Sequence, residues 1–365
     1  MPFAHHPLHM IANPPANDPI HWNDDARRIE FERWLASLGE HRVDASSLRA
    51  ASADASFRRY FRIDAPDEHT SYIVMDAPPP HEDVRPFVQI AGLIAQAGLH
   101  APLVVASDVE RGFLLLTDLG STPYLEALNA ARASGDEQRA GALMRKGFSA
   151  LLQWQQRVAG DALPPYDDAL LRRELALFPD WCVTREYGVD WDDKQREQWR
   201  SACDLLVRSA LAQPTVAVHR DWMPRNLMVS EPNPGILDFQ DAVRGPITYD
   251  VASMLRDAFI SWDEEQELDW AVRHWQQARK AGLPVDDDFG EFWRQLEWMG
   301  LQRHLKVLGI FCRLKHRDGK PKYSADLPRF FKYAHRVCTR YHGLGPLAAL
   351  IEPLAGTERS AGYTF

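Results

Sequence analysis

Alternation of apolar and polar positions predicts that the first third of the chain is mostly β-structure. An amphipathic helix is predicted at 25–39. Four strands are predicted after it: SFRRYFRID (56–64), SYIVMD (71–76), APLVVASD (101–108) and GFLLLTDLG (112–120). Pro, Gly and Asp separate them, as turn residues do. One helical pattern interrupts the strands at 82–99, where apolar residues recur on one face.

Helical periodicity dominates the chain after Gly120. Long amphipathic helices are predicted at 137–158, 194–212, 263–281, 287–316 and 327–342. A single strand-like island interrupts them, in which LMVS (227–230), a Pro/Asn/Gly turn and GILDF (235–239) have the pattern of a β-hairpin. The sequence therefore predicts an α+β protein of two lobes. A small, mostly-β lobe covers 24–119 and a large helical lobe covers 120–365, after a loose extension at 1–23.

Composition narrows the possible partners. The chain has 365 residues, 45% of them apolar, which is enough for one large domain or two lobes with real cores. Its net charge of −9 argues against a nucleic-acid partner, because phosphate backbones attract basic surfaces. Four widely spaced cysteines form neither a zinc pattern nor a disulfide framework, so we expect a cytoplasmic protein. No apolar run approaches the ~18 residues needed to span a membrane, and no obligate protein partner is implied.

The island and its flanks, VAVHRDWMPRNLMVSEPNPGILDFQDA (216–242), carry the strongest chemical signal. Asp221, Asn226 and Asp238 stand at the edges of the predicted hairpin. Phosphoryl transfer needs one carboxylate near the acceptor hydroxyl and further oxygen ligands for the Mg²⁺ on ATP. Taken singly, such residues usually form caps and turns. The ordered set of three instead favours Asp221 as the base, with Asn226 and Asp238 as metal ligands.

Two segments, VHRDWMPRN (218–226) and ILDFQDA…GPITYDVA (236–252), resemble the catalytic and metal-binding motifs of the aminoglycoside phosphotransferase/choline kinase superfamily. The resemblance implies a protein-kinase-like fold of two lobes, with ATP and Mg²⁺ as cofactors and a small-molecule alcohol as the acceptor. It assigns the same roles to Asp221, Asn226 and Asp238, and it adds His219 and Asp250 as residues that support the catalytic loop.

Other stretches resemble a bacterial family of anomeric amino-sugar kinases: DASFRRYFRI, MDAPPP, LLLTDLG, ELALFPDWC and LQRHLKVLGIFCRLKHRDGK. Members of that family phosphorylate the C1 hydroxyl of N-acetylmuramate and N-acetylglucosamine in peptidoglycan recycling. One alternative is a phosphotransferase for an aminoglycoside, choline or homoserine, which the acidic run WDEEQELDW (262–270) would suit. The other is a nucleotide-binding pseudokinase without catalysis.

The expected phosphate cover, ASADASFRR (51–59), contains no glycine. Its small residues Ser52, Ala53 and Ser56 could still let backbone N–H groups approach a phosphate. After it, the backbone from Thr117 to Leu119 is expected to bind the adenine edge, at the hinge between the lobes.

The nucleotide lobe also lacks the usual pair of charges. Met75 stands where a phosphate-pairing Lys is expected, and Gln89 stands where its Glu partner is expected. Arg58, Arg59 and Arg62 lie nearby in the sequence. One of them, Arg58 for example, is expected to neutralise phosphate, unless all three are solvated charges at a sheet edge.

The acceptor site is predicted from the helix LQRHLKVLGIFCRL (301–314). Arg303, Lys306 and Arg313 fan over an arc of roughly 80° on it, opposite its apolar face, and such an arc faces either water or a cleft. In a cleft it would suit an acidic acceptor, and N-acetylmuramate carries a lactyl carboxylate.

Further acceptor-site candidates lie outside that helix. Glu174 and the pair Asp180–Trp181 could contact a sugar, or they could be a helix surface and a core tryptophan. Asp241 could assist the metal, touch the sugar or cap the next helix.

Overall fold

The computed structural model describes residues 20, 22, 24–53, 57–65 and 70–356. Its contacts divide the chain into two compact units. Unit 1 is Met1–Ser121 together with Gly235–Gln240, and unit 2 is Thr122–Pro234 together with Asp241–Phe365. The short return of the chain to unit 1 at 235–240 differs from the single division near residue 119 that the sequence suggests.

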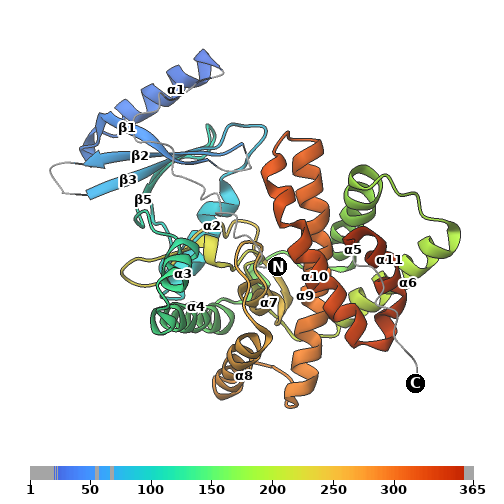
Figure 1. Cartoon of the computed structure of the whole chain (residues 1–365). Coiled ribbons are helices and arrows are strands. Elements are labelled where there is room, and N and C mark those ends of the chain that lie inside the picture. Colours follow the sequence, from blue (N-terminus) through green and yellow to red (C-terminus); the bar gives the residue numbers. More distant parts are fainter. Residues whose placement is uncertain (1–19, 21, 23, 54–56, 66–69, 357–365) are drawn as a thin grey trace, which may run out of the picture. The chain divides into compact units, whose positions relative to one another are not determined.

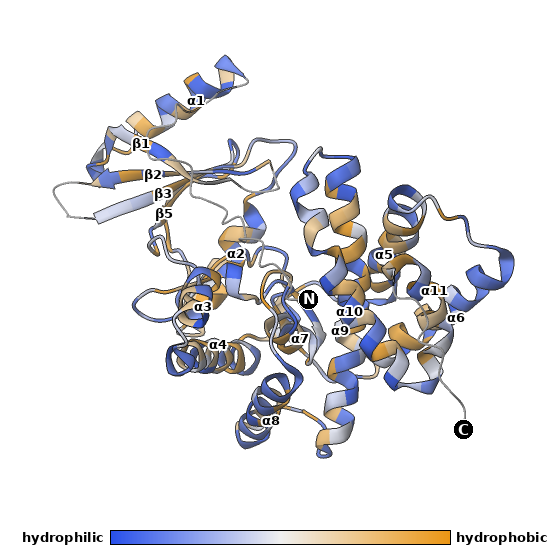
Figure 2. Ribbon diagram, in the orientation of Figure 1, coloured by the Kyte–Doolittle hydropathy of each residue, from blue (hydrophilic) through white to orange (hydrophobic). Residues whose placement is uncertain are grey.

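Unit 1 is built on an antiparallel sheet with the strand order β1-β2-β3-β5-β4 (Figure 1). Its strands are β1 Asp44–Ala53, β2 Arg59–Ala65, β3 Thr70–Asp76, β4 Val104–Asp108 and β5 Phe113–Thr117. Two helices accompany them, α1 Asp25–Ala36 and α2 Arg85–Gln96. Phe31 of α1 packs on Phe61 and Phe113, whose strands β2 and β5 show hydrophobic positions in Figure 2. This packing makes the core between α1 and the sheet.

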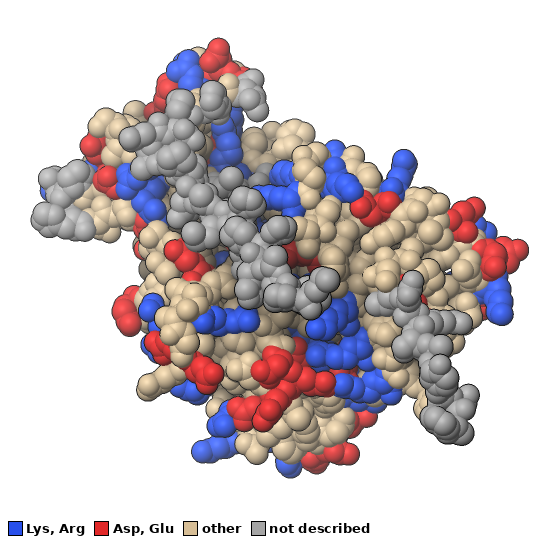
Figure 3. Space-filling view, in the orientation of Figure 1, with Lys and Arg blue, Asp and Glu red and all other residues tan. Residues whose placement is uncertain are grey.

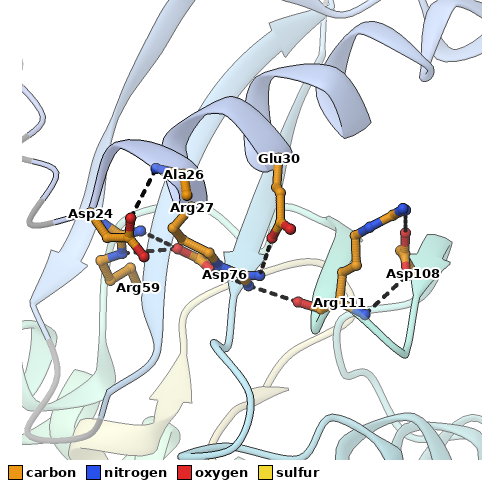
Figure 4. A network of polar contacts seen from close by, with 8 residues as sticks. All are labelled: Asp24, Ala26, Arg27, Glu30, Arg59, Asp76, Asp108 and Arg111. Carbon is orange, nitrogen blue, oxygen red and sulfur yellow. Dashed lines mark hydrogen bonds and ion pairs between the residues drawn. The ribbon is translucent and has the colours of Figure 1, made fainter.

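A buried carboxylate fastens α1 to this sheet (Figure 4). Asp76, at the end of β3, is fully buried, and its Oδ1 accepts a hydrogen bond of 2.6 Å from Arg27 of α1. Its Oδ2 accepts one of 3.0 Å from Nε of Arg59. The Arg59 guanidinium also lies 4.0 Å from the ring of Trp22. Of the extension predicted at 1–23, only Ile20 and Trp22 lie among the described residues, and Trp22 contacts this core.

Unit 2 is mostly helical. Its helices are α3 Tyr124–Ala133, α4 Glu137–Arg157, α5 Asp168–Leu177, the π-helical η4 Phe178–Glu186, α6 Asp193–Leu211, α7 Tyr249–Leu255, α8 Glu264–Lys280, α9 Phe289–His316, α10 Leu327–Arg340 and α11 Gly345–Ala355. Strand β6 Thr215–Val218 pairs antiparallel with β9 Val243–Pro246. Gly309 lets α9 approach the end of α5, because a Cβ there would lie 2.4 Å from the carbonyl group of Leu177.

The elements confirm the predicted α+β class. The five long helices predicted in the second part of the chain are present as α4, α6, α8, α9 and α10. The segments predicted as a hairpin are shorter than expected, because β7 Leu227–Met228 and β8 Gly235–Ile236 have two residues each. Among the described residues, no helix combines the length and the apolar character that a membrane span requires.

Candidate active site

Asp221 lies in the loop after β6, and a buried carboxylate holds the backbone of that loop. Asp250, fully buried at the start of α7, accepts hydrogen bonds from the backbone N–H of His219 at 2.7 Å and of Arg220 at 3.0 Å. Arg220 has a φ of 76°, a left-handed conformation that costs energy for a residue with a side chain. Burial raises the pKa of Asp250 to about 7, although the two N–H groups oppose the shift. Asp250 therefore stabilises a strained backbone next to Asp221.

The backbone around Asp221 is fixed on both sides. Its N–H donates to Nδ1 of the buried His219 at 3.3 Å, and its carbonyl oxygen accepts a hydrogen bond of 3.0 Å from Nδ2 of Asn226. The Asn226 N–H in turn donates to the Met223 carbonyl at 2.8 Å. The Asp221 side chain remains 35% exposed, so a substrate can reach its carboxylate. The structure thus brings together four of the predicted residues: Asp221, Asn226, His219 and Asp250.

Glu174 of α5 is buried, and protein groups surround its carboxylate. Its Oε1 lies 3.0 Å from Nζ of Lys306 and 2.5 Å from Nη2 of Arg220. Its Oε2 accepts hydrogen bonds from the Tyr166 hydroxyl and, at 3.2 Å, from Nε2 of Gln302. Burial opposes ionisation, but the two cations outweigh it, and the pKa of Glu174 falls to about 2. Glu174, which is expected to contact the acceptor, holds two cations beside the loop that carries Asp221.

Because the folded-state pKa of Glu174 lies below the usual 4.5, its ionisation stabilises the fold above pH 4.5, and this stability is lost as pH falls toward 2. The shift corresponds to about 3 kcal/mol. We expect Glu174→Gln to lower the free energy of unfolding by roughly that amount at pH 7, since two buried cations lose their counter-charge. The difference from wild type should shrink below pH 4.5. Urea unfolding at a series of pH values measures it, and a difference independent of pH would contradict the assigned ion pairs.

The basic residues predicted on 301–314 have different environments. Arg303 and Lys306 of α9 are 2% and 8% exposed, so they do not form a solvated face. Arg303 Nη2 lies 4.0 Å from Asp221 Oδ1, and Lys306 is bound to Glu174. Arg313 is half-buried and lies ten residues further along α9, about 15 Å away at 1.5 Å per residue. The structure therefore brings Arg303 and Lys306 to the cluster around Asp221 and Glu174 and leaves Arg313 apart.

Two other acceptor-site candidates have little support from their surroundings. Asp241 is exposed, and its backbone carbonyl accepts a hydrogen bond of 3.4 Å from Arg220. Strand β9 follows Asp241, so the interpretation of Asp241 as a helix cap is wrong. Asp180 is exposed on η4, and Trp181 packs partly buried against the hydrophobic core of unit 2.

The acidic run predicted to suit a cationic acceptor lies elsewhere in unit 2. Trp262, Asp263, Glu265 and Asp269 line a cavity of ≈ 500 Å³ with residues of α3 and α4. Acidic side chains gather over this part of the surface in Figure 3. Of the residues that the structure describes, none that contacts Asp221 or Glu174 lines that cavity.

Within unit 1, Asp238 also has a left-handed backbone, with a φ of 61°. Its Oδ1 accepts a hydrogen bond of 2.9 Å from Nε2 of Gln240. Between them, Phe239 is fully buried, and its ring centroid lies 4.6 Å from that of Phe87 on α2. The aromatic contact anchors the backbone that carries Asp238.

The expected adenine-binding backbone is partly engaged in unit 1. The Thr117 N–H donates to the Leu103 carbonyl at 3.0 Å, and the Thr117 hydroxyl accepts from the Leu103 N–H at 2.9 Å. The Thr117 N–H is therefore not available to adenine. Only the backbone of Asp118 and Leu119 remains as a candidate for the adenine contact. The Asp118 carboxylate accepts hydrogen bonds from Arg62 at 2.5 Å and from the Gly120 N–H at 2.9 Å.

The positive charge expected for phosphate is neutralised within unit 1. Arg58 forms an ion pair of 2.9 Å with Glu82, Arg59 is bound to Asp76, and Arg62 is bound to Asp118. These partners show that the three arginines are not simply solvated edge charges.

The backbones of two residues of the expected phosphate cover belong to the sheet. Ser52 pairs with Tyr60 and Ala53 pairs with Arg59 at the end of β1. Ser56 lies outside the described residues. Met75, at the position where a Lys is expected, is fully buried in the sheet.

Sequence reasoning missed Arg220, Tyr166 and Gln302 as parts of the site. Arg220 could have been found, because it stands between His219 and Asp221 in the same motif. Tyr166 and Gln302 carried no signal, since only the fold brings them to Glu174.

Comparisons with known proteins agree with this geometry. Residues 47–293 match the profile described as "Phosphotransferase enzyme family". The chain is 50% identical over 340 residues to an N-acetylmuramate/N-acetylglucosamine kinase of Pseudomonas aeruginosa, covering 91% of this chain and 98% of that protein. It is 52% identical over 318 residues to the protein of the same name from Pseudomonas putida, covering 87% and 91%.

The fold also matches solved structures. A choline/ethanolamine kinase family protein from Mesorhizobium loti matches with a TM-score of 0.57 and 13% identity, covering 90% of this chain and 99% of that one. At this identity the likeness concerns the fold alone, and it confirms the predicted protein-kinase-like fold.

Proposed function

Because the chain belongs to the phosphotransferase enzyme family, we propose that it transfers the γ-phosphoryl group of ATP to the C1 hydroxyl of N-acetylmuramate and N-acetylglucosamine. The names of the Pseudomonas relatives, at 50% and 52% identity, support this choice of acceptors. The product would be a sugar 1-phosphate, and the reaction would belong to peptidoglycan recycling.

One observation carries the proposal furthest. The partly exposed carboxylate of Asp221 lies beside three cationic side chains. Arg303 and Lys306 are almost fully buried, and Arg220 lies next to them. Such cations could bind an anionic group of the acceptor, such as the carboxylate of N-acetylmuramate, which choline and the aminoglycosides lack. Glu174, Asp221 and the buried Asp250 and Asp257 share the compensation of these positive charges.

Asp221 acts as the base in this proposal. An anomeric hydroxyl is more acidic than an ordinary alcohol, so a carboxylate suffices to take its proton as the C1 oxygen attacks phosphorus. Arg220 and Asp250 hold the loop that orients Asp221. A pseudokinase is disfavoured, because Asp221, Asn226 and Asp238 are all retained.

Asn226 and Asp238 are the proposed ligands of Mg²⁺. Their oxygens suit a hard cation, and the Asn226 nitrogen is turned to the Asp221 carbonyl, so the amide oxygen would be the ligand. When bound, Mg²⁺ offsets the negative charge of the ATP phosphates. We place the reaction in the cytoplasm, where ATP is available and where the four free cysteines would stay reduced.

We expect ADP release with ATP and Mg²⁺ in the presence of N-acetylmuramate or N-acetylglucosamine, and much less with choline, homoserine or kanamycin. Phosphorus–proton NMR of the product should show coupling of the phosphate to the anomeric proton. A phosphate on C6, or turnover only with a cationic alcohol, would overturn the proposed acceptor. The membership in the phosphotransferase family would remain.

A further inference from the structure

The cations beside Asp221 differ in how their charges are compensated. Lys306 has the Glu174 carboxylate at 3.0 Å and donates to the Tyr249 hydroxyl at 3.2 Å. Arg220 has the same carboxylate at 2.5 Å. Both are held by the protein itself, so neither depends on a ligand for a partner.

Among the described residues, Arg303 has no carboxylate within hydrogen-bond distance. Its charge only opposes, through space, the rise in pKa that burial causes at Asp250 and Asp257. Its Nη2 lies 4.0 Å from Asp221 Oδ1, beyond hydrogen-bond distance, and 3.8 Å from the sulfur of Met223. Its Nη1 is buried and has no hydrogen-bond partner among the described residues. A guanidinium offers five donors, and leaving a desolvated donor unpaired is costly. The arrangement is that of a donor held ready for an acceptor supplied by a ligand.

We propose that Arg303 determines specificity for an acidic acceptor by binding the carboxylate that N-acetylmuramate carries and N-acetylglucosamine lacks. The inference rests on the proposed function. The lactyl group is a flexible substituent two ring carbons away from C1. With the C1 hydroxyl on Asp221, its carboxylate could approach Arg303, whose Nη2 lies 4.0 Å from Asp221 Oδ1. A second carboxylate so close to Asp221 would repel it, and the Arg303 charge offsets that repulsion.

The two other basic residues on α9 do not fit this role as well. Lys306 is neutralised by Glu174, and Arg313 lies about 15 Å further along the helix. Arg313→Ala is therefore the matched comparison, because it removes the same charge from the same helix without touching the cluster around Asp221.

The test measures kcat/KM for both sugars with wild type, Arg303→Ala, Arg303→Gln and Arg313→Ala. The ratio of kcat/KM for N-acetylmuramate to that for N-acetylglucosamine should fall about ten- to a hundredfold in both Arg303 variants, as expected for a lost charge-assisted contact. It should stay at the wild-type value in Arg313→Ala. Arg303→Gln keeps much of the packing, and circular dichroism with thermal melting verifies the fold of each variant.

A substrate whose carboxylate charge has been removed provides the complementary test. With wild-type enzyme, kcat/KM for the methyl ester of N-acetylmuramate should be lower than that for N-acetylmuramate by the same factor. Replacing Arg303 should then change kcat/KM for the ester very little. An unchanged sugar ratio in the Arg303 variants would overturn the proposal and would mean that Arg303 serves Asp221 or phosphate in both reactions. If wild type phosphorylates neither sugar, the proposed function itself fails, which the wild-type measurement alone reveals.

Discussion

Asp238→Asn should abolish Mg²⁺-dependent turnover and leave the fold intact. The left-handed φ of 61° at this position is one that Asn adopts more readily than most residues, so the variant adds no backbone strain. An Asn side chain also keeps an oxygen that can accept the hydrogen bond from Gln240. What is lost is one negative charge at a proposed ligand of a divalent cation. Activity is measured as ADP release over a Mg²⁺ titration, with thermal melting as the check on folding.

Asp241→Asn is the comparison, because Asp241 is an exposed carboxylate only three residues further on. We expect a clearly smaller effect there, which would separate a metal ligand from a general loss of negative charge in this segment. Near-normal activity of Asp238→Asn at limiting Mg²⁺ would show that Asp238 is not a metal ligand. Equal losses of activity in both variants would instead indicate that Asp241 also takes part in binding the metal.

Asp221→Asn should lower kcat by about 10²–10⁴ with little change in ATP affinity. The replacement keeps the size of the side chain, and the backbone contacts with His219 and Asn226 do not depend on the carboxylate. The proton of the acceptor hydroxyl then has no base. Steady-state kinetics give kcat, and titration with a fluorescent ATP analogue gives the affinity.

Both sugars should suffer alike in Asp221→Asn, since the base serves the C1 hydroxyl that they share. This outcome differs from the selective loss expected when Arg303 is replaced. A variant that loses ATP binding but turns over normally at saturating ATP would reverse the proposed roles, because Asp221 would then act on the nucleotide.

Periodic patterns predicted five long helices of unit 2, but they missed β1, α3, α5 and α11, although these elements also have exposed positions. Helices α4, α6, α8, α9 and α10 carry apolar and polar faces and were all predicted. Helix α7 was not, because all seven of its residues, Tyr249–Leu255, are buried and no polar face repeats. The β7 and β8 segments were overextended, since apolar residues there fill the core without continuing as strands.

The motif predicted that His219, Asn226 and Asp250 belong with Asp221, but it could not predict what each polar side chain contacts. Glu174 looked like an acceptor ligand, yet Tyr166, Arg220 and Lys306 surround its carboxylate from three distant segments. The choice between water and a cleft for the basic arc on 301–314 depended on burial, which spacing along one helix does not determine. Charge compensation is a property of the fold, so the role of Arg303 became visible only there.

The return of residues 235–240 to unit 1 constrains the order in which the chain can fold. The Ile236 N–H donates to the His100 carbonyl at 2.8 Å, and buried Phe239 packs on Phe87. During synthesis, Phe87 therefore lacks this cover until more than a hundred further residues have left the ribosome. A fragment ending at Ser121 would expose an apolar surface beside α2, and such a nascent chain would be a natural client for a chaperone.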